Sequence, residues 1–113
     1  MKVEFLTLPN NKKPAQEFLG ELDDRTLAKV FKLIERLEAE GRLVFPHARK
    51  LEGYKGLWEM RIQSQRGAIR IFYVYWEQDS IFLVSGFIKK SQKTPIRELE
   101  KSMNYLKQAG VNL

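Results

Sequence analysis

Three stretches rich in β-branched and aromatic residues decide the fold: LWEMRI at 57–62, AIRIFYVYW at 68–76 and IFLVSGFI at 81–88. Short polar segments separate these stretches, so we expect three consecutive antiparallel strands joined by hairpins. The middle stretch is apolar along almost its whole length, which predicts a central strand at least partly covered on both faces.

The residues before this group predict one strand and two helices. KVEFLTL at 2–8 alternates weakly between polar and apolar residues, as a strand does. Pro14 suits the first turn of a helix that would run to about Leu22. A second helix follows, capped by Asp23 or Asp24, because its apolar residues recur at helical spacing.

The remaining segments complete the pattern. Residues 42–56 are basic and irregular, whereas a last helix is predicted from Pro95 to about Ala109, with Thr94 as its N-cap. The order β-α-α-β-β-β-α indicates the α+β class. We expect a small, twisted, mainly antiparallel four-stranded sheet, with two N-terminal helices and one C-terminal helix packed mainly on one face. Residues 1–113 are expected to form a single domain.

Positive charge is concentrated in the second part of the chain. The 113 residues carry a formal net charge of +6. Residues 1–41 contain 7 Lys/Arg and 8 Asp/Glu, whereas residues 42–113 contain 13 Lys/Arg and 6 Asp/Glu. This distribution slightly favours a surface that faces nucleic acid over a basic surface kept for solubility.

The composition also bears on the compartment. The N-terminal MKVEFLTLPNNKKP lacks the apolar core of a secretory signal, and no apolar run is long enough to cross a bilayer. The chain has no cysteine, which fits a reducing environment. We therefore expect a cytoplasmic protein that does not contact a membrane.

Most conventional catalytic motifs are missing from the sequence. The single histidine, His47, follows a proline in the irregular segment and is expected to be an ordinary surface residue. Ser85-Gly86 lies in a strand but lacks the G-x-S-x-G pattern of a nucleophile elbow. Carboxylates are not clustered as a magnesium-dependent nuclease requires, so we expect no metal and no cofactor.

Two arginines stand within the predicted strands. Arg61 ends the first of the three stretches, and Arg70 interrupts the apolar middle one. A charge in a buried strand needs either an ion-pair partner or a ligand in a cleft. Structural Arg70–Glu59 or Arg61–Glu77 pairs are one interpretation. Phosphate binding is the other, since a guanidinium forms paired, charge-assisted hydrogen bonds.

Lysines and aromatic residues extend the candidate site. Lys89, Lys90 and Lys93 directly precede a predicted helix N-terminus, a location that favours anions. Lys50, Lys55, Lys89 and Lys93 are candidate RNA-binding residues. Base stacking is possible for three aromatic residues, although at a helix–sheet interface such rings more often belong to the core: Tyr73, Tyr75 and Trp76.

The segment from 50 to 109 resembles the HigB-like, phage-derived branch of the RelE/ParE toxin superfamily. Three of its hallmarks occur in order: a GLWE-[LM]-R strand, a [YI]RIFY strand, and a GF-x-KK-[ST]-QKTP turn that opens the last helix. The first 50 residues match only in their plan of strand, helix and helix. The resemblance implies a RelE-like fold.

The resemblance further implies a ribosome-dependent endoribonuclease that cleaves mRNA without metal and is neutralised by a helix-turn-helix antitoxin. The substrate 2′-hydroxyl would attack the adjacent phosphate, giving a cyclic phosphate and a 5′-hydroxyl. By position, Arg70 and Lys90 would stabilise the pentacovalent phosphate, and Arg61 would orient the scissile group.

The residues that transfer protons do not carry over from the resemblance. Relatives often place Tyr or His where this chain has Ser91-Gln92. Glu59, Tyr73 or a lysine of lowered pKa remain as alternatives. Two other functions also stay open: a ParE-like gyrase inhibitor without nuclease activity, and an inactive corepressor bound to its antitoxin.

Overall fold

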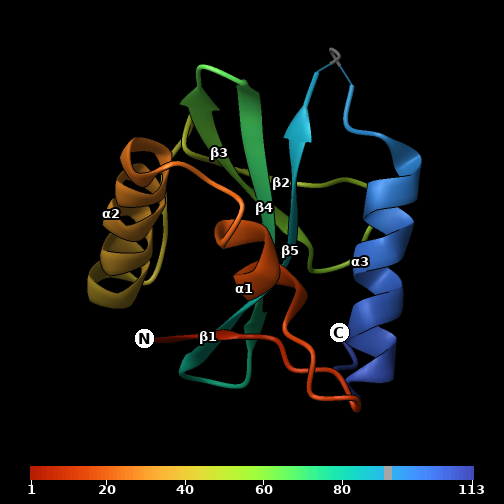
Figure 1. The fold of residues 1–113 in the computed structure, drawn as a ribbon. Coiled ribbons are helices and arrows are strands. Elements are labelled where there is room, and N and C mark those ends of the chain that lie inside the picture. Colours follow the sequence, from red (N-terminus) through yellow and green to blue (C-terminus); the bar gives the residue numbers. More distant parts are fainter. Residues whose placement is uncertain (91–92) are drawn as a thin grey trace.

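The three central stretches form three consecutive antiparallel strands, as the sequence predicts. The computed structural model describes residues 1–90 and 93–113. In it, β3 (Trp58–Ser64), β4 (Gly67–Trp76) and β5 (Ser80–Lys89) are joined by two tight turns (Figure 1). β4 lies between the other two strands, and its residues 69–74 are buried. The expectation of a central strand covered on both faces is confirmed.

Two short strands flank this core, so the sheet has five strands and not the predicted four. β1 (Lys2–Phe5) pairs in parallel with β5, and β2 (Ala48–Lys50) pairs antiparallel with β3. The strand order is β1-β5-β4-β3-β2. β2 comprises only three residues and lies within the segment expected to be irregular. β2 is recognised by its backbone pairing with β3. Three residues are too few to show an alternating pattern, so the sequence alone does not reveal this strand.

The two N-terminal helices begin and end near the residues that the sequence indicates. α1 covers Pro14–Leu19, with proline in its first turn. α2 covers Asp24–Glu40, and the Asp23 carboxylate accepts a hydrogen bond from the Thr26 backbone N–H at 3.2 Å. Gly41 follows α2 with φ +77°, a left-handed conformation that glycine adopts without a steric penalty.

The C-terminal helix α3 (Ile96–Gln108) begins one residue later than expected. Its N-cap is Pro95, which forms no side-chain cap hydrogen bond. The prediction that Thr94 caps this helix is therefore wrong. The Thr94 hydroxyl donates instead to the Glu59 carboxylate at 2.9 Å.

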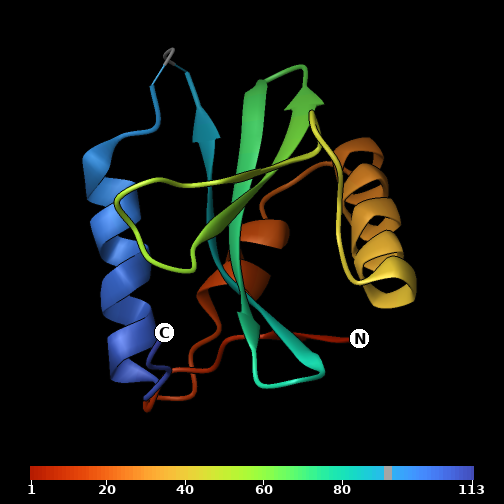
Figure 2. The same ribbon diagram turned by 180° about the vertical axis from the view of Figure 1, so that it is seen from behind.

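The helices lie on both faces of the sheet, and not mainly on one. One apolar cluster joins α1 and α2 to one face and contains Phe18, Val30 and Ile71. A second cluster joins α3 to the other face and contains Phe72 and Leu106. Ile71 and Phe72 are neighbours in β4, so their side chains point to opposite faces. Figures 1 and 2 show α2 and α3 at opposite ends of the sheet, with α1 crossing one face only.

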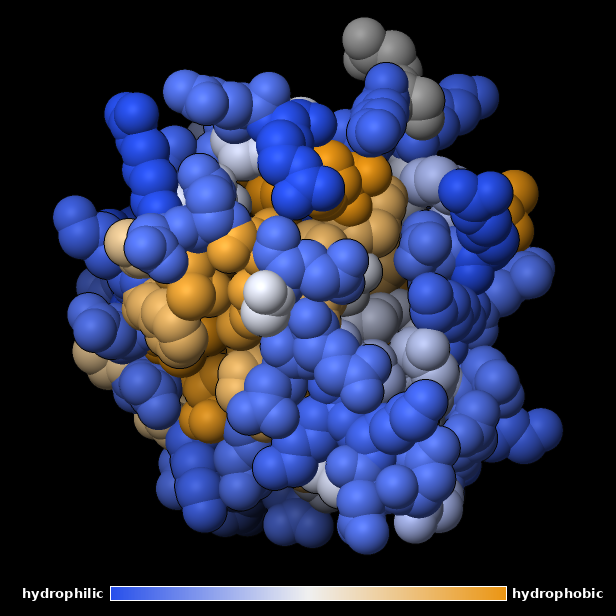
Figure 3. All heavy atoms as spheres, in the orientation of Figure 1, coloured by the Kyte–Doolittle hydropathy of each residue, from blue (hydrophilic) through white to orange (hydrophobic). Residues whose placement is uncertain are grey.

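Viewed from the side of α1, the surface is largely hydrophilic. Apolar side chains gather in the left part of this view, where α2 lies, and between the helices near its top (Figure 3). Phe31 of α2 is 46% exposed and lines a hollow together with Val3, Phe5 and Ile34. Among the described residues, no helix has the length and apolar character needed to span a membrane.

Candidate phosphate-binding site

The two strand arginines lie directly opposite each other. Arg61 of β3 pairs with Arg70 of β4 in the antiparallel ladder, so both side chains emerge on the face that α3 covers. Like charges in a cross-strand pair repel and destabilise a sheet. A negative group is therefore required beside them, and two residues before Arg61, on the same face, the chain places Glu59.

The Glu59 carboxylate contacts three groups that stabilise it: two guanidinium groups and one hydroxyl. Its Oε1 atom is 3.5 Å from Arg70 Nε and 3.9 Å from Arg61 Nε, and its Oε2 atom accepts the hydrogen bond from Thr94. Glu59 is 2% exposed and Arg70 is 4% exposed. The structural Arg70–Glu59 pair considered from the sequence is present. Arg61 shares this carboxylate rather than pairing with Glu77.

One carboxylate does not satisfy both guanidinium groups. Within the described residues, the buried Nε atoms of Arg61 and Arg70 have no hydrogen-bond partner, although Arg70 Nη1 donates to its neighbour's carbonyl, Ile69 O, at 3.0 Å. Burial lowers the pKa of Arg70, and the charge of Glu59 opposes that shift. The cluster thus keeps a positive excess and unused donors, which an anion would complement.

Lys89 extends the positive charge along the same face. It pairs with Ala68 at the end of β5, two positions from the Phe87–Arg70 pair. Burial lowers the pKa of Lys89, and the charge of Arg70 lowers it further; the Glu59 carboxylate opposes the shift. A lysine amine with a lowered pKa loses its proton more readily near neutral pH, as proton-transfer chemistry requires.

Arg49 is a member of the site that the sequence analysis did not single out. It pairs with Glu59 across the β2–β3 ladder, and its charge contributes to the lowered pKa of Lys89. Its position depends on the three-residue strand β2, which the sequence pattern does not reveal. The only available signal was its place in a basic segment.

An open pocket of about 420 Å³ lies beside this cluster, between β2, the loop that follows it, and the start of α3. In Figure 2 this loop passes in front of the sheet towards α3. Four of the nine lining residues are basic and one is acidic. The lining residues are Arg49, Lys50, Leu51, Glu52, Tyr54, Lys89, Lys93, Thr94 and Leu99.

The structure brings together only part of the predicted set of site residues. Lys50, Lys89 and Lys93 line the pocket. Lys55 is not among the lining residues; it lines a neighbouring hollow that shares Lys50 and Glu52 with the pocket, and another hollow with Lys107 of α3. Lys90 is exposed just after β5 and does not belong to the described lining of the pocket. Ser91-Gln92 lies outside the described residues.

Tyr73 is separated from the cluster. Its side chain belongs to the apolar cluster on the α1 and α2 face, fully buried against Trp58 and Tyr75. Burial raises its pKa far above the ordinary value. Tyr75 donates to the Gly41 carbonyl at 2.9 Å, and Trp76 packs in the second apolar cluster. Tyr73 is thus a core residue, and Tyr75 and Trp76 are half-buried and pack against the core.

Ser85 and His47, which were also considered from the sequence, do not belong to this cluster. Ser85 is buried and shares a hydrogen bond with Ser102 of α3, which ties that helix to β5. His47 is half-buried between α2 and β3, and its carbonyl accepts the Arg61 backbone N–H. Among residues 1–90 and 93–113, no three His, Cys, Asp or Glu side chains are grouped so that they could hold a metal ion.

Comparison with known proteins identifies the family. Residues 17–107, most of the chain, match the family described as Phage derived protein Gp49-like (DUF891). No curated protein matches the chain. The matched range includes β3, β4 and β5, with Glu59, both strand arginines and Lys89. The chain therefore belongs to the Gp49-like family, a family of RelE/HigB-type toxins associated with toxin–antitoxin pairs.

Proposed function

We propose that this protein is an mRNA endoribonuclease that inhibits translation by cleaving mRNA on the ribosome, as the toxin of a toxin–antitoxin pair. The observation that carries the proposal is the concentration of positive charge around Glu59. Arg61 and Arg70 contact the Glu59 carboxylate, and the charges of Arg49, Arg61 and Arg70 all lower the pKa of Lys89, beside an open basic pocket. A gyrase-binding protein has no need of such a phosphate-binding centre.

The chemistry follows from the groups that surround the pocket. The scissile phosphate binds between Arg61 and Lys89. The pentacovalent phosphate is stabilised by the positive charge of Arg61 and by that of Lys89 once Lys89 has taken the 2′-hydroxyl proton. The 2′-oxygen forms a bond to phosphorus while the bond from phosphorus to O5′ breaks. The 2′-hydroxyl gives its proton to the neutral amine of Lys89, and O5′ takes a proton from solvent water. The products are a 2′,3′-cyclic phosphate and a 5′-hydroxyl.

Lys89 is the proton acceptor in this proposal. Its pKa is lowered, so its neutral amine is available to take the 2′-hydroxyl proton. Glu59 is less suited to this role because its carboxylate is buried and occupied by two arginines and Thr94. Tyr73 lies on the opposite face and is left out of the mechanism.

Arg70 acts as a positioning residue in this proposal. At 4% exposure its guanidinium faces Glu59 and not the open pocket. It fixes the carboxylate that holds Arg61, and its charge lowers the pKa of Lys89. This revises the role that the sequence suggested for Arg70, direct contact with the phosphate. Lys89 is half-buried and its pKa is lowered, whereas Lys90 is exposed. We therefore favour Lys89 over Lys90 as the reactive lysine.

The experiment that tests the proposal is induced expression, followed by mapping of mRNA 5′ ends, with gyrase-dependent DNA breaks measured in parallel. We expect new 5′-hydroxyl ends within translated mRNA, which disappear in Lys89→Ala and persist in Lys12→Ala, a matched exposed lysine before α1 and outside the pocket. Isolated ribosomes should support the same cleavage in EDTA once their integrity is controlled. DNA breaks without mRNA cleavage would replace the proposal by gyrase inhibition, and 5′-phosphate ends would contradict the mechanism.

A further inference from the structure

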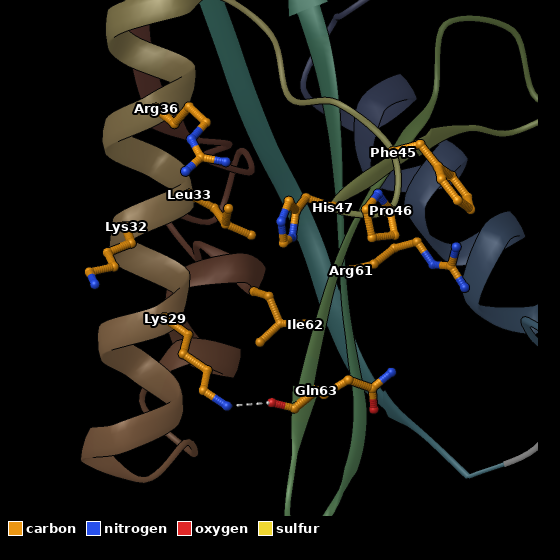
Figure 4. Close-up of a pocket in the computed structure, with 10 residues that line it drawn as sticks. All are labelled: Lys29, Lys32, Leu33, Arg36, Phe45, Pro46, His47, Arg61, Ile62 and Gln63. Carbon is orange, nitrogen blue, oxygen red and sulfur yellow. Dashed lines mark hydrogen bonds between the residues drawn. The ribbon is translucent and has the colours of Figure 1, made fainter.

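A second and larger hollow lies away from Glu59 and Lys89. It has a volume of about 600 Å³ and runs between α2 on one side and β3, with the loop before β2, on the other. Figure 4 shows its ten lining residues, with Leu33, His47 and Ile62 directed into the space between the two walls. β2 pairs only with the first half of β3. The edge of the second half of β3 therefore has no strand beside it, and the hollow separates it from α2.

The floor of this groove is apolar, and so is one edge. Leu33 and Ile62 lie at the bottom and are nearly buried, at 7% and 6% exposure. Phe45, at the edge, is 75% exposed, and the adjacent Val44 is 57% exposed. Large apolar side chains exposed beside an apolar hollow favour burial by a partner.

The rim of the groove is strongly basic. Four of the ten lining residues carry positive charge and none is acidic; the basic ones are Lys29, Lys32, Arg36 and Arg61. Lys29 Nζ donates to the Gln63 carbonyl at 3.1 Å, which closes one end of the groove (Figure 4). Lys32 and Arg36 lie one helical turn apart on α2 and are both exposed. Their spacing suits two carboxylates of a partner that follows the helix.

The combination of an apolar floor and a basic rim favours an acidic polypeptide over RNA as the ligand of the groove. RNA binding to a protein surface relies on phosphate contacts and on flat rings for stacking. Here the apolar Leu33, Pro46 and Ile62 make up much of the lining. Of the two aromatic rings in the lining, His47 is half-buried, and Phe45 already has the Arg61 guanidinium 6.0 Å from its centroid. A polypeptide whose apolar side chains enter the groove and whose carboxylates reach the rim satisfies both features.

We propose that this groove is a docking site for an acidic, amphipathic polypeptide segment of a protein partner. The antitoxin implied by the family is the protein that would carry such a segment. The groove and the phosphate-binding site are distinct but adjacent, since Arg61 lines the groove and also lies 3.9 Å from Glu59. Binding in the groove does not depend on RNA cleavage.

The test uses a defined probe on the full chain. The probe is a fluorescein-labelled peptide of about 14 residues, four helical turns, with leucine on one face and glutamate on the other. A control peptide carries lysine in place of glutamate, and a labelled oligouridylate tests for RNA. The groove variant is Lys32→Glu/Arg36→Glu. The matched control is Lys12→Glu/Lys13→Glu, which changes the net charge equally at exposed residues before α1. Phe45→Ser tests the apolar edge.

We expect the acidic peptide to bind the unaltered protein, as measured by fluorescence anisotropy. Binding should weaken about tenfold or more in the groove variant and in Phe45→Ser, but by less than about twofold in the control variant. The lysine peptide should not bind. Failure of the acidic peptide to bind, or equal weakening in both charge-reversal variants, overturns the proposal. Loss of oligouridylate binding in the groove variant, with peptide binding unchanged, makes the groove an RNA site instead.

Discussion

At the scale of single residues, Glu59 is the centre of the site. Its carboxylate lies within 3.9 Å of both arginines, which face each other across adjacent strands, and it accepts a hydrogen bond from Thr94. A buried ion pair contributes little net stability compared with apolar residues, yet removing one partner is costly because a buried charge is left behind. Stability and activity are therefore separable by substitution at these positions.

Arg70→Met should lower the free energy of unfolding by about 3 kcal/mol, because Glu59 loses its closest positive partner. The double variant Arg70→Met/Glu59→Gln should recover most of that loss, since the neutral amide still accepts from Thr94. Neither variant should arrest growth, because both disturb the arginines and Lys89. Urea unfolding beside a growth assay measures both properties. A double variant as unstable as the single one would contradict the assigned ion pair, and full toxicity of either would remove Arg70 from the mechanism.

The pH dependence of cleavage should report on Lys89. If the neutral amine of Lys89 accepts the proton, the cleavage rate rises with pH and levels off once the pH exceeds the lowered pKa of Lys89. Because the Glu59 charge raises that pKa, Glu59→Gln lowers it further, so the rising limb should move to lower pH. Single-turnover rates on programmed ribosomes, from neutral to mildly alkaline pH, measure the shift. Lys89→Arg should abolish the limb; a shift to higher pH in Glu59→Gln would exclude Lys89 as the base.

At the scale of elements, close contact between α1 and β5 depends on one glycine. Gly86 faces Phe18 of α1, and a methyl group added at Gly86 would collide with that ring. Ser85-Gly86 resembles part of a catalytic motif in the sequence, but the structure gives these residues packing roles: Ser85 bonds to α3, and Gly86 makes room for α1. Neighbouring residues of one strand thus hold helices on opposite faces.

Gly86→Ala should lower the free energy of unfolding by about 1–3 kcal/mol, the usual cost of overpacking a core. Adding Phe18→Leu should restore part of this loss, because the smaller side chain leaves room for the methyl group. Toxicity per folded molecule should not change, since the contact lies on the face opposite Lys89. The measurements are thermal melts and growth arrest. Stability equal to that of the unaltered protein, or a specific loss of toxicity, would contradict the contact or its separation from the site.

The elements that the sequence predicted are those with a long, uniform pattern. The strands of the 57–88 region follow from β-branched and aromatic residues between polar turns, and α2 follows from helical spacing and its Asp23 cap. The side on which α3 packs could not be predicted. Apolar residues fill both faces of β4, so alternation does not indicate which helix covers which face.

The residues of the candidate site on β3 and β4 could be predicted from the sequence, whereas Arg49 of the short strand β2 and Thr94 could not. A charge within an apolar strand draws attention to Arg61 and Arg70, and Glu59 was considered as a partner for the latter. Arg49 and Thr94 reach Glu59 only through long-range contacts, which are the pairing of β2 and the closure of the chain before α3. No local pattern encodes such contacts.

At the scale of the whole molecule, the two parts of the chain have different roles. Residues 1–41 have a net charge of −1 and supply α1 and α2, which cover one face of the sheet. Residues 42–113 have a net charge of +7 and supply both strand arginines and the four basic residues that line the pocket on the other face. A positive field on one side attracts and orients a polyanion before specific contacts form.

Binding to RNA should therefore weaken steeply as salt increases. Each phosphate neutralised on a single strand contributes about −0.7 to the slope of log K against log salt, so three or four contacts in the pocket predict a slope of about −2 to −3. Arg49→Ala removes one contact and should make the slope shallower by about 0.7. Lys12→Ala, at an exposed residue before α1, should leave it unchanged.

This salt dependence is measured by fluorescence anisotropy with a short, labelled single-stranded RNA, using protein carrying Lys89→Ala in all cases so that the RNA stays intact. Loss of Lys89 makes every slope shallower by the same amount, so the difference between Arg49→Ala and Lys12→Ala is preserved. If Arg49→Ala and Lys12→Ala have the same slope, Arg49 does not contact phosphate, and the proposed site is reduced to Arg61 of β3 and the lysines at and after the end of β5. Affinity independent of salt would contradict a phosphate-binding face altogether, because counterion release accompanies every such contact.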